Sequence, residues 1–580
     1  MNKSFLTLSF AVVSTINFAQ TLQDAITKTD NERFDLAASD YRALIAKEPN
    51  KGENYFYMGE NYFQNGLTDK NDALIDSANI FYAKGVELNA TNALNYVGLG
   101  KILLYKNNMA EAKTQFFKAA SVAQNKNAEV MRQTAKAWLS TDNKNPDEAI
   151  AQINLAIKLE PKNAENYTIL GDAQLEKTPA DGGPAIKSYK MATSLNPKSP
   201  KGILREGKLY QRGRNYQLAL DKYKEAIALD PTYAPAYREI AELYYNVQQN
   251  SKCIENWKKY LELNNSDQAR FRFIQALYRN KQYAEVINEG ETLKKSGMNK
   301  YTIERLMGYG YYEIGNKTDT AAYTKGLRSI NKFFELTAPI SDFLYLPSDY
   351  KYKGLLLSKT GKDSLGIIEI EKAISLDPTY AKDGYSDIAG IYYKNKRYTK
   401  VTNYLEKKQT LDPTSLNNTD YFNLGRAYYN IALPLFNEAM NTKDAKIKTA
   451  KETEATPNLI KADTAFAGLV RKNPSWVTAH IWRGRTNSLT EILLKKEKEG
   501  MAKVHYEKVL SMVKPEEKTT TYKKETIEAL EYLGSYYVSI NDKVKADEIF
   551  NQLKEIDSNN AKVKNYFTPQ KSGTVKPGTK

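Results

Sequence analysis

A leucine followed two residues later by a proline recurs along this 580-residue chain at a nearly constant interval. Pro161, Pro197 and Pro231 lie 36 and 34 residues apart, and Pro378 and Pro413 lie 35 residues apart. A fixed period of this length is typical of a repeat array, in which each unit buries its apolar face only against its neighbours. The period constrains the fold strongly, because a chain of this length exceeds what one hydrophobic core supports.

Within one period, apolar residues recur with the spacing of an amphipathic helix. Tyr237, Ile240, Ala241 and Tyr244 form one stripe at positions i, i+3, i+4 and i+7. A proline near the end of each unit stops the second helix and sets the turn into the next unit. Each unit is therefore predicted to be a helix–turn–helix pair, with small residues where the helices approach and large rings filling the remaining space.

The order of small and aromatic residues resembles the tetratricopeptide repeat. The unit that starts at Pro200 carries the pattern as Gly207, Tyr210, Ala219, Tyr223, Ala226 and Pro231. The unit that starts at Pro347 carries it as Tyr350, Gly354, Leu357, Gly366, Ile370, Ala373 and Pro378. About 13 or 14 such units fit between Gln20 and roughly residue 560. The resemblance implies an all-α fold, a right-handed α-solenoid of stacked hairpins with two sub-stacks as an option, and most of the 42 tyrosines are then core residues.

Departures from the repeat suggest the domain organisation. We predict a signal peptide over 1–19, an N-terminal stack over 20–265, irregular repeat-like units over 266–346, a C-terminal stack over 347–560 and a terminal segment with a flexible tail over 561–580. Pro413 and Pro474 are 61 residues apart, 27 more than one repeat of 34, which indicates an insertion near 433–459. Extra residues near Gly66 predict a longer loop between two helices.

The N-terminus has the pattern of a secretory signal. Lys3 precedes a mostly apolar stretch from Phe5 to Phe18, and Ala19 is a small residue suited to cleavage before Gln20. No later segment approaches the roughly 20 apolar residues of a membrane-spanning helix. We therefore expect an exported protein of the periplasm without a transmembrane segment, with a peripheral position at the outer membrane as a further option.

Residues suited to catalysis or metal binding are few. Cys253 has no second cysteine to pair with, and it does not form a zinc site at usual spacing with His480 and His505. His480 is expected at a packing position and His505 partly exposed. No nucleophile elbow, metalloprotease helix or phosphate-binding loop stands out. The sequence therefore predicts neither an enzyme nor a cofactor.

The formal net charge of +16 raises the question of nucleic acid. The lysines are spread along the chain without a compact basic block, and an exported chain seldom meets nucleic acid. We therefore expect protein partners and no nucleic acid.

The resemblance implies that certain positions on the first helix of each unit line a binding groove. Arginine and tyrosine, which are enriched at binding hot spots, occupy many of them. Taken singly, each of these residues fits a solvated helix face better than a binding surface, whereas the set as a whole favours a binding surface. The candidate protein-binding residues are Arg205, Lys208, Arg212, Arg238, Tyr245, Arg305, Tyr309, Tyr312, Lys351, Arg426, Tyr429 and Arg485.

The composition, rich in Lys, Asn and Tyr, together with the signal ending in Ala-Gln, resembles exported repeat proteins of the Bacteroidetes type. This implies a non-catalytic scaffold or adaptor in the periplasm, within an envelope-assembly or secretion complex. The alternative is a SusD-like protein that binds glycans or nutrients. The regular repeats and the lack of a cysteine after the signal argue against that alternative.

Overall fold

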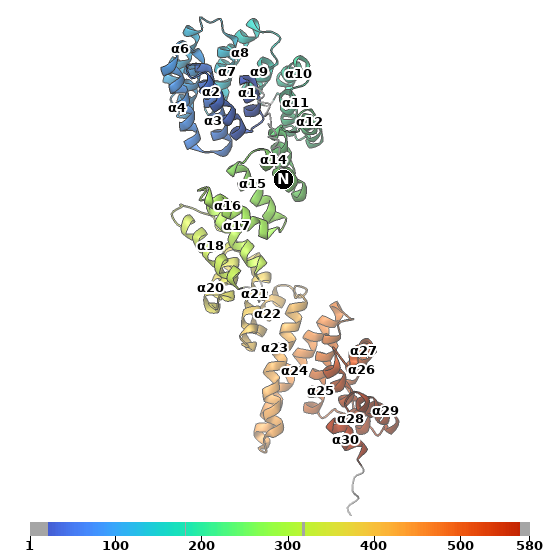
Figure 1. The fold of residues 1–580 in the computed structure, drawn as a ribbon. Coiled ribbons are helices and arrows are strands. Elements are labelled where there is room, and N and C mark those ends of the chain that lie inside the picture. Colours follow the sequence, from blue (N-terminus) through green and yellow to red (C-terminus); the bar gives the residue numbers. More distant parts are fainter. Residues whose placement is uncertain (1–20, 180, 316–319, 569–580) are drawn as a thin grey trace, which may run out of the picture. The chain divides into compact units, whose positions relative to one another are not determined.

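The computed structural model describes residues 21–179, 181–315 and 320–568, and these residues form α-helices joined by short turns, with no strand among them. The chain divides into two compact units, unit 1 up to Ile314 and unit 2 from Gly315. Figure 1 shows the succession of helices in each unit. The division falls within 266–346, the part of the sequence that fits the repeat least well, and the finer predicted boundaries stay predictions.

Unit 1 is a run of helices that pair in chain order. Its helices are α1 (Leu22–Asp30), α2 (Phe34–Lys47), α3 (Gly52–Asp69), α4 (Asp72–Leu88), α5 (Ala93–Tyr105), α6 (Met109–Val122), α7 (Ala128–Leu139), α8 (Pro146–Leu159), α9 (Ala164–Lys177), α10 (Gly183–Leu195), α11 (Pro200–Arg212), α12 (Tyr216–Leu229), α13 (Ala234–Asn246), α14 (Asn250–Leu263), α15 (Asp267–Arg279), α16 (Tyr283–Lys295) and α17 (Tyr301–Ile314). Consecutive helices form antiparallel hairpins from α1–α2 to α15–α16. We call the first helix of each hairpin its A helix and the second its B helix.

Unit 2 continues the same plan. Its helices are α18 (Ala321–Thr337), α19 (Pro347–Lys359), α20 (Asp363–Leu376), the 3-10 helix η1 (Pro378–Tyr380), α21 (Ala381–Lys394), α22 (Tyr398–Leu411), α23 (Asn418–Asn441), α24 (Ala445–Lys472), α25 (Val477–Leu494), α26 (Lys503–Met512), α27 (Pro515–Lys518), α28 (Lys523–Ser539), α29 (Lys543–Ile556) and α30 (Ala561–Phe567). The hairpins run from α19–α20 to α28–α29. The all-α solenoid predicted from the repeat is confirmed.

An aromatic ring of the B helix seated on a glycine of the A helix holds many hairpins together. In the hairpin α11–α12, a Cβ added to Gly207 would lie 2.6 Å from the ring of Tyr223, which is fully buried. Gly171 faces Tyr189 in the same way in the hairpin α9–α10, and Gly534 faces Phe550 in the hairpin α28–α29. Only a residue without a side chain lets the two helices approach this closely.

The prolines that define the repeat end the B helices, as predicted. The helices α8, α10 and α12 end at leucines two residues before Pro161, Pro197 and Pro231. The residue before a proline is disfavoured in helical conformation, so the chain turns at a fixed point in every unit.

The two lengthened regions of the sequence form longer helices. The extra residues near Gly66 extend α3 to 18 residues, which corrects the prediction of a longer loop. The surplus near 433–459 extends α23 to 24 residues and α24 to 28 residues, and the two helices pack along Phe436, Ala455 and Leu459. Pro434 and Pro457 lie inside these helices, where each removes a backbone hydrogen bond.

Unit 1 closes on itself, a feature that the repeat pattern does not predict. The turn between α1 and α2 meets later hairpins: Glu32 pairs with Arg238 of α13 at 2.7 Å, and the amide of Asn31 donates to Asp230 at 2.7 Å. Ser266 at the start of α15 donates to Asp69 at the end of α3. The first two hairpins of unit 1 therefore contact hairpins that lie about 200 residues further along the chain.

Two predicted segments fall outside the described residues. They are the signal peptide over 1–19 and the tail from 569 to 580. Among the helices that are described, none combines the length and the apolar character that crossing a bilayer requires.

We expect Gly207→Leu to destabilise the fold by about 1–3 kcal/mol, because the new side chain overlaps a ring that has no room to move. Gly213→Ala is the matched control in the same hairpin, since the nearest atom to its added Cβ lies 3.5 Å away. Urea denaturation of the full chain followed by circular dichroism measures both. Equal denaturation midpoints for the two variants would show that the ring-on-glycine contact does not limit the helix approach.

Candidate protein-binding groove

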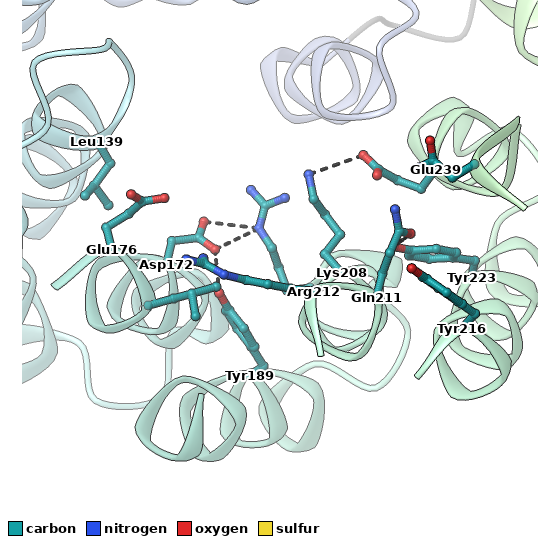
Figure 2. A pocket seen from close by; sticks show the side chains of 13 residues that line it. Leu139, Asp172, Glu176, Tyr189, Lys208, Gln211, Arg212, Tyr216, Tyr223 and Glu239 are labelled. Atoms are coloured by element: carbon teal, nitrogen blue, oxygen red, sulfur yellow. Dashed lines mark hydrogen bonds and ion pairs between the residues drawn. The ribbon is translucent and has the colours of Figure 1, made fainter. Parts of the chain in front are cut away.

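The basic residues predicted for the groove of unit 1 are mostly engaged by carboxylates of neighbouring helices. Arg205 lies 2.9 Å from Asp172, Lys208 lies 3.2 Å from Glu239, and Arg238 lies 3.1 Å from the same Glu239. The first two pairs line a pocket of about 540 Å³, and Figure 2 shows the pair of Lys208 with Glu239 along its wall. Asp172 raises the pKa of Arg205 above its already high ordinary value. This wall is therefore a set of ion pairs rather than a row of free cations.

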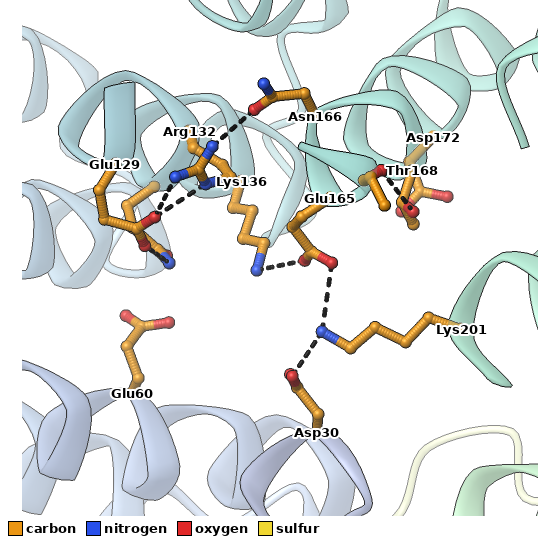
Figure 3. Close-up of polar contacts among 12 residues, drawn as sticks. Asp30, Glu60, Glu129, Arg132, Lys136, Glu165, Asn166, Thr168, Asp172 and Lys201 are labelled. Carbon is orange, nitrogen blue, oxygen red and sulfur yellow. Dashed lines mark hydrogen bonds and ion pairs between the residues drawn. The ribbon is translucent and has the colours of Figure 1, made fainter. Parts of the chain in front are cut away.

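A chain of ion pairs also crosses the interior of unit 1. Lys201 of α11 lies 2.5 Å from Asp30 of α1 and 3.2 Å from Glu165 of α9, which in turn lies 2.6 Å from Lys136 of α7 (Figure 3). Burial by itself would raise the pKa of Glu165, but Lys136 and Lys201 hold the pKa of this carboxyl well below its ordinary value. These contacts join the first hairpin to three others across a polar cavity of about 290 Å³.

The most deeply buried pair of unit 1 is Glu60 with Lys101. Their side-chain atoms lie 2.6 Å apart, and the two residues are 4% and 2% exposed. Tyr82 donates a hydrogen bond to the same carboxylate at 2.6 Å. The carboxylate thus has two donors from two different helices, which compensates much of the cost of removing both charges from water.

This arrangement of tyrosine, carboxylate and cation recurs along the chain. Tyr189 donates to Asp172, which pairs with Arg205, and Tyr506 donates to Glu528, which pairs with Arg485. In each case the ring belongs to the packed interior of a hairpin, whereas the carboxylate and the cation lie on A helices. Burial raises the pKa of these tyrosines, so each hydroxyl keeps its proton and acts as a donor. The tyrosine excess therefore serves packing and also positions the carboxylates of the A-helix face.

We expect Lys101→Met to destabilise unit 1 by about 3–5 kcal/mol, because it leaves the buried carboxylate of Glu60 without its cation. The double variant Lys101→Met with Glu60→Gln should recover most of this loss, since no uncompensated charge remains. Thermal denaturation of wild type, both single variants and the double variant gives the coupling free energy. A double variant as unstable as Lys101→Met would contradict the assigned pairing.

Other candidate residues of unit 1 lie in different surroundings. The side chain of Arg212 is exposed at the end of α11. The guanidinium carbon of Arg279 lies over the ring of Tyr245, 3.9 Å from the ring centroid. Tyr309 is 3% exposed, with its ring centroid 5.8 Å from that of Tyr278, so it is a core residue and its placement in the groove is corrected. Arg305 and Tyr312 are half-buried on the same helix, α17.

In unit 2 some candidate residues pair with carboxylates and others stack on an aromatic ring. Lys351 lies 3.9 Å from Asp387, and Arg485 makes hydrogen bonds of 2.6 to 3.0 Å with both carboxylate oxygens of Glu528. The guanidinium of Arg426 lies over the ring of Trp482, at 4.7 Å from its centroid. Tyr429 packs against the same tryptophan edge-on at 5.3 Å. The structure therefore brings Arg426, Tyr429 and Arg485 together around one ring.

A pocket of about 570 Å³ opens beside this cluster. Tyr429, Tyr506, Tyr532 and Tyr536 contribute its aromatic wall, from the helices α23, α26 and α28. Sequence reasoning did not select Trp482, Tyr532 or Tyr536. Trp482 and Tyr532 occupy helix positions at which aromatic residues are also core residues elsewhere in the array. Only the packing therefore shows whether such a residue lies in the core or at a pocket.

The structure brings the two histidines of the chain together. The ring centroids of His480 on α25 and His505 on α26 lie 6.1 Å apart, and the residues are 7% and 8% exposed. The burial of His505 corrects the expectation of partial exposure, whereas His480 is at a packing position as predicted. Burial, together with Arg483, lowers the pKa of His505 to about 4, and burial also lowers the pKa of His480.

The buried histidines predict a loss of stability in mild acid. The pKa of His505 in the folded chain lies below its ordinary value near 6.5, so the unfolded chain binds more protons as the pH falls below that value. The stabilisation is complete above about pH 6.5 and is lost progressively toward pH 4. We expect a loss of about 2 kcal/mol between pH 7 and pH 5 from this residue.

Denaturant titrations of wild type and His505→Gln at pH 7 and pH 5 test this. The variant should lose about 2 kcal/mol less than wild type over the same interval. An equal loss of unfolding free energy in the two proteins would show that His505 has the same pKa in the folded and unfolded chains.

Within the described part of the chain, no three His, Cys, Asp or Glu residues lie so that they could hold a metal ion. Cys253 is buried in α14, and burial raises the pKa of its thiol to about 12. A thiol with so high a pKa is protonated at neutral pH and a poor nucleophile.

Comparison with protein-family models gives no match, and comparison with curated proteins gives none either. Among solved structures, the C-terminal part of a TPR (tetratricopeptide) repeat-containing protein from Cytophaga hutchinsonii is 27% identical, over 52% of this chain and 100% of that chain, with a TM-score of 0.39. A TPR protein from Thermus thermophilus is 22% identical, over 32% of this chain and 98% of that one, with a TM-score of 0.28. YrrB, described as a TPR protein with an unusual peptide-binding site, is 21% identical over 35% of this chain and 98% of that one, with a TM-score of 0.21.

The described residues of this chain form an all-α solenoid of stacked helix–turn–helix hairpins. The assignment rests on the hairpin pairing, the ring-on-glycine contacts and the proline-terminated B helices of the chain itself. The similar structures are shorter arrays that match segments of it.

Proposed function

We propose that this protein is a non-catalytic scaffold of the periplasm, which holds a protein partner of an envelope-assembly or secretion complex on the A-helix face of unit 2. The observation that carries the proposal is the 570 Å³ pocket beside Trp482, with its wall of tyrosines. Tyrosine, tryptophan and arginine supply large contact areas and directed hydrogen bonds, and they dominate the binding energy of protein interfaces.

The difference between the two units supports this choice of surface. In unit 1 the first hairpin joins later hairpins through Asp30 and Glu32, and the basic residues of its A helices are mostly paired. A partner segment entering there would have to break ion pairs that are already formed. In unit 2 the pocket between the A helices α23, α25 and α28 is bounded by aromatic rings, by glutamates and by the ion pair of Arg485 with Glu528.

The surroundings of the groups with shifted pKa values support a non-catalytic role. Strongly shifted pKa values mark functional sites in many enzymes, but structural networks shift them too. Here the raised pKa values belong largely to tyrosines such as Tyr82 and Tyr506, whose hydroxyls donate to carboxylates inside the helix packing. These groups position other side chains, and none of them is paired with a nucleophile.

The export part of the proposal rests on the sequence pattern before Gln20, and the choice of complex rests on the resemblance to exported repeat proteins. A glycan-binding role is the alternative outcome, since tyrosines in a polar pocket also suit sugar rings.

We expect a photo-reactive amino acid at Tyr536, in the pocket wall, to cross-link a specific protein in cells of the native host, because the partner covers that wall. Phe117 is the matched control, since its ring is 77% exposed on a B helix of unit 1 and lies outside the proposed surface. Mass spectrometry identifies the cross-linked protein in the periplasmic fraction.

Cross-linking from position 117 but not from position 536 would contradict the proposed surface. Recovery of the protein from the cytoplasm alone would contradict the proposed location. Retention of the purified protein on glycans, without any protein cross-link, would favour the alternative role.

A further inference from the structure

Two arginines flank Trp482 on the A-helix face of unit 2. The guanidinium carbon of Arg426 lies 4.7 Å from the ring centroid, and that of Arg485 lies 4.9 Å from it. Both cations are therefore attracted to the same indole ring and are held in defined positions. They differ in what their N–H groups bind.

Arg485 is fully engaged within the chain. Its Nε donates to both carboxylate oxygens of Glu528, at 2.9 and 3.0 Å, and its Nη2 donates to Glu528 Oε2 at 2.6 Å. Tyr506 donates to the same carboxylate at 2.8 Å. The charge of Arg485 is thus compensated before any partner arrives.

Arg426 is not engaged in this way. Its guanidinium also lies 5.8 Å from the ring of Phe422 and 6.0 Å from that of Tyr393, so three aromatic rings surround it. Its Nε is buried without a hydrogen-bond partner, and no carboxylate oxygen in residues 21–179, 181–315 and 320–568 lies within 4.0 Å of its nitrogens. Aromatic stacking stabilises the charge, but the rings accept no hydrogen bond from the N–H groups in the plane of the guanidinium. These N–H groups therefore lack an acceptor.

We propose that Arg426 binds the carboxylate of an aspartate or glutamate side chain in an extended segment of the partner protein. This proposal rests on the proposed function of unit 2 and adds the chemistry of its ligand. A guanidinium with free in-plane donors matches a carboxylate with two parallel hydrogen bonds. The aromatic rings around it lower the local polarity, which strengthens such a pair.

The surroundings favour a side-chain carboxylate over the carboxyl terminus of a partner. Hairpins continue on both sides of α23, with α19–α20 and α21–α22 before it and α25–α26 and α28–α29 after it. An extended segment on the A helices therefore has surface to contact in both directions from Arg426. Tyr429, three residues further along α23, lines the 570 Å³ pocket, so an apolar side chain next to the acidic residue would enter that pocket.

An array of nine-residue peptides with blocked termini, probed with the full-length protein, tests the proposal. We expect the bound peptides to share an aspartate or glutamate next to an apolar residue. In the peptide that binds best, replacing the acid by its amide should weaken binding to wild type by about tenfold or more. The same replacement should change binding to Arg426→Gln by less than about twofold. The acid of the peptide and Arg426 contribute through one shared interaction, so once Arg426 is removed the acid contributes little.

The matched control is the double variant Arg483→Gln with Asp463→Asn, which removes another cation of α25, outside the pocket, without leaving an unpaired charge. It should keep the acidic preference of wild type, and circular dichroism should show equal helicity for all three proteins. Bound peptides without an acidic residue, or an equal loss for Arg426→Gln and the double variant, would overturn the role of Arg426 while leaving unit 2 as a binding surface.

A second set of peptides with free carboxyl termini separates the two sources of a carboxylate. Tighter binding of the free terminus, with no need for an acidic side chain, would overturn the assignment to a side chain. Absence of any bound peptide would overturn the inference, and the cross-linking from position 536 would then decide separately whether unit 2 holds a partner.

Discussion

The close approach of two helices within each hairpin is the constraint on which the rest of this structure depends. The ring of Tyr223 packs on the backbone at Gly207, where only a glycine leaves enough room. The same contact recurs between Gly171 and Tyr189. Where a hairpin buries its ring in this way, its remaining apolar face is left for the next hairpin, and the array grows as one continuous core.

Tyrosine gives this contact a second consequence that phenylalanine would not. The hydroxyl at the far end of a buried ring must find an acceptor. Tyr223 donates to the amide oxygen of Gln211, whereas Tyr189 and Tyr506 donate to a carboxylate on an A helix. That carboxylate then holds an arginine or lysine, as in the group of Tyr506, Glu528 and Arg485. Core packing and the charge pattern of the A-helix face are therefore linked through single side chains.

The same repeat produces two different surfaces because the two units use their charges differently. In unit 1, Lys201 and Arg238 bind acidic residues around the first hairpin, so this hairpin is tied to α11 and α13 by ion pairs. In unit 2, aromatic rings line a pocket between A helices. Arg426 stacks on Trp482 there and pairs with no carboxylate of the described residues. Binding capacity in such an array depends on which charges are left uncompensated as much as on which residues the repeat provides.

The sequence by itself determined the all-α repeat fold, because the 34-residue period, the prolines such as Pro231 and the small residues such as Gly207 act locally within each hairpin. It also placed Arg426, Tyr429 and Arg485 on one face. Only the tertiary structure decided that the turn at Glu32 meets Arg238, that Tyr309 is buried, and that His480 lies beside His505. The contact of Glu32 with Arg238 joins residues far apart in the chain, and it depends on the small rotation between successive hairpins accumulated over many repeats, which no local pattern specifies. The other two contacts depend on how side chains of neighbouring helices pack, which the repeat pattern does not specify either.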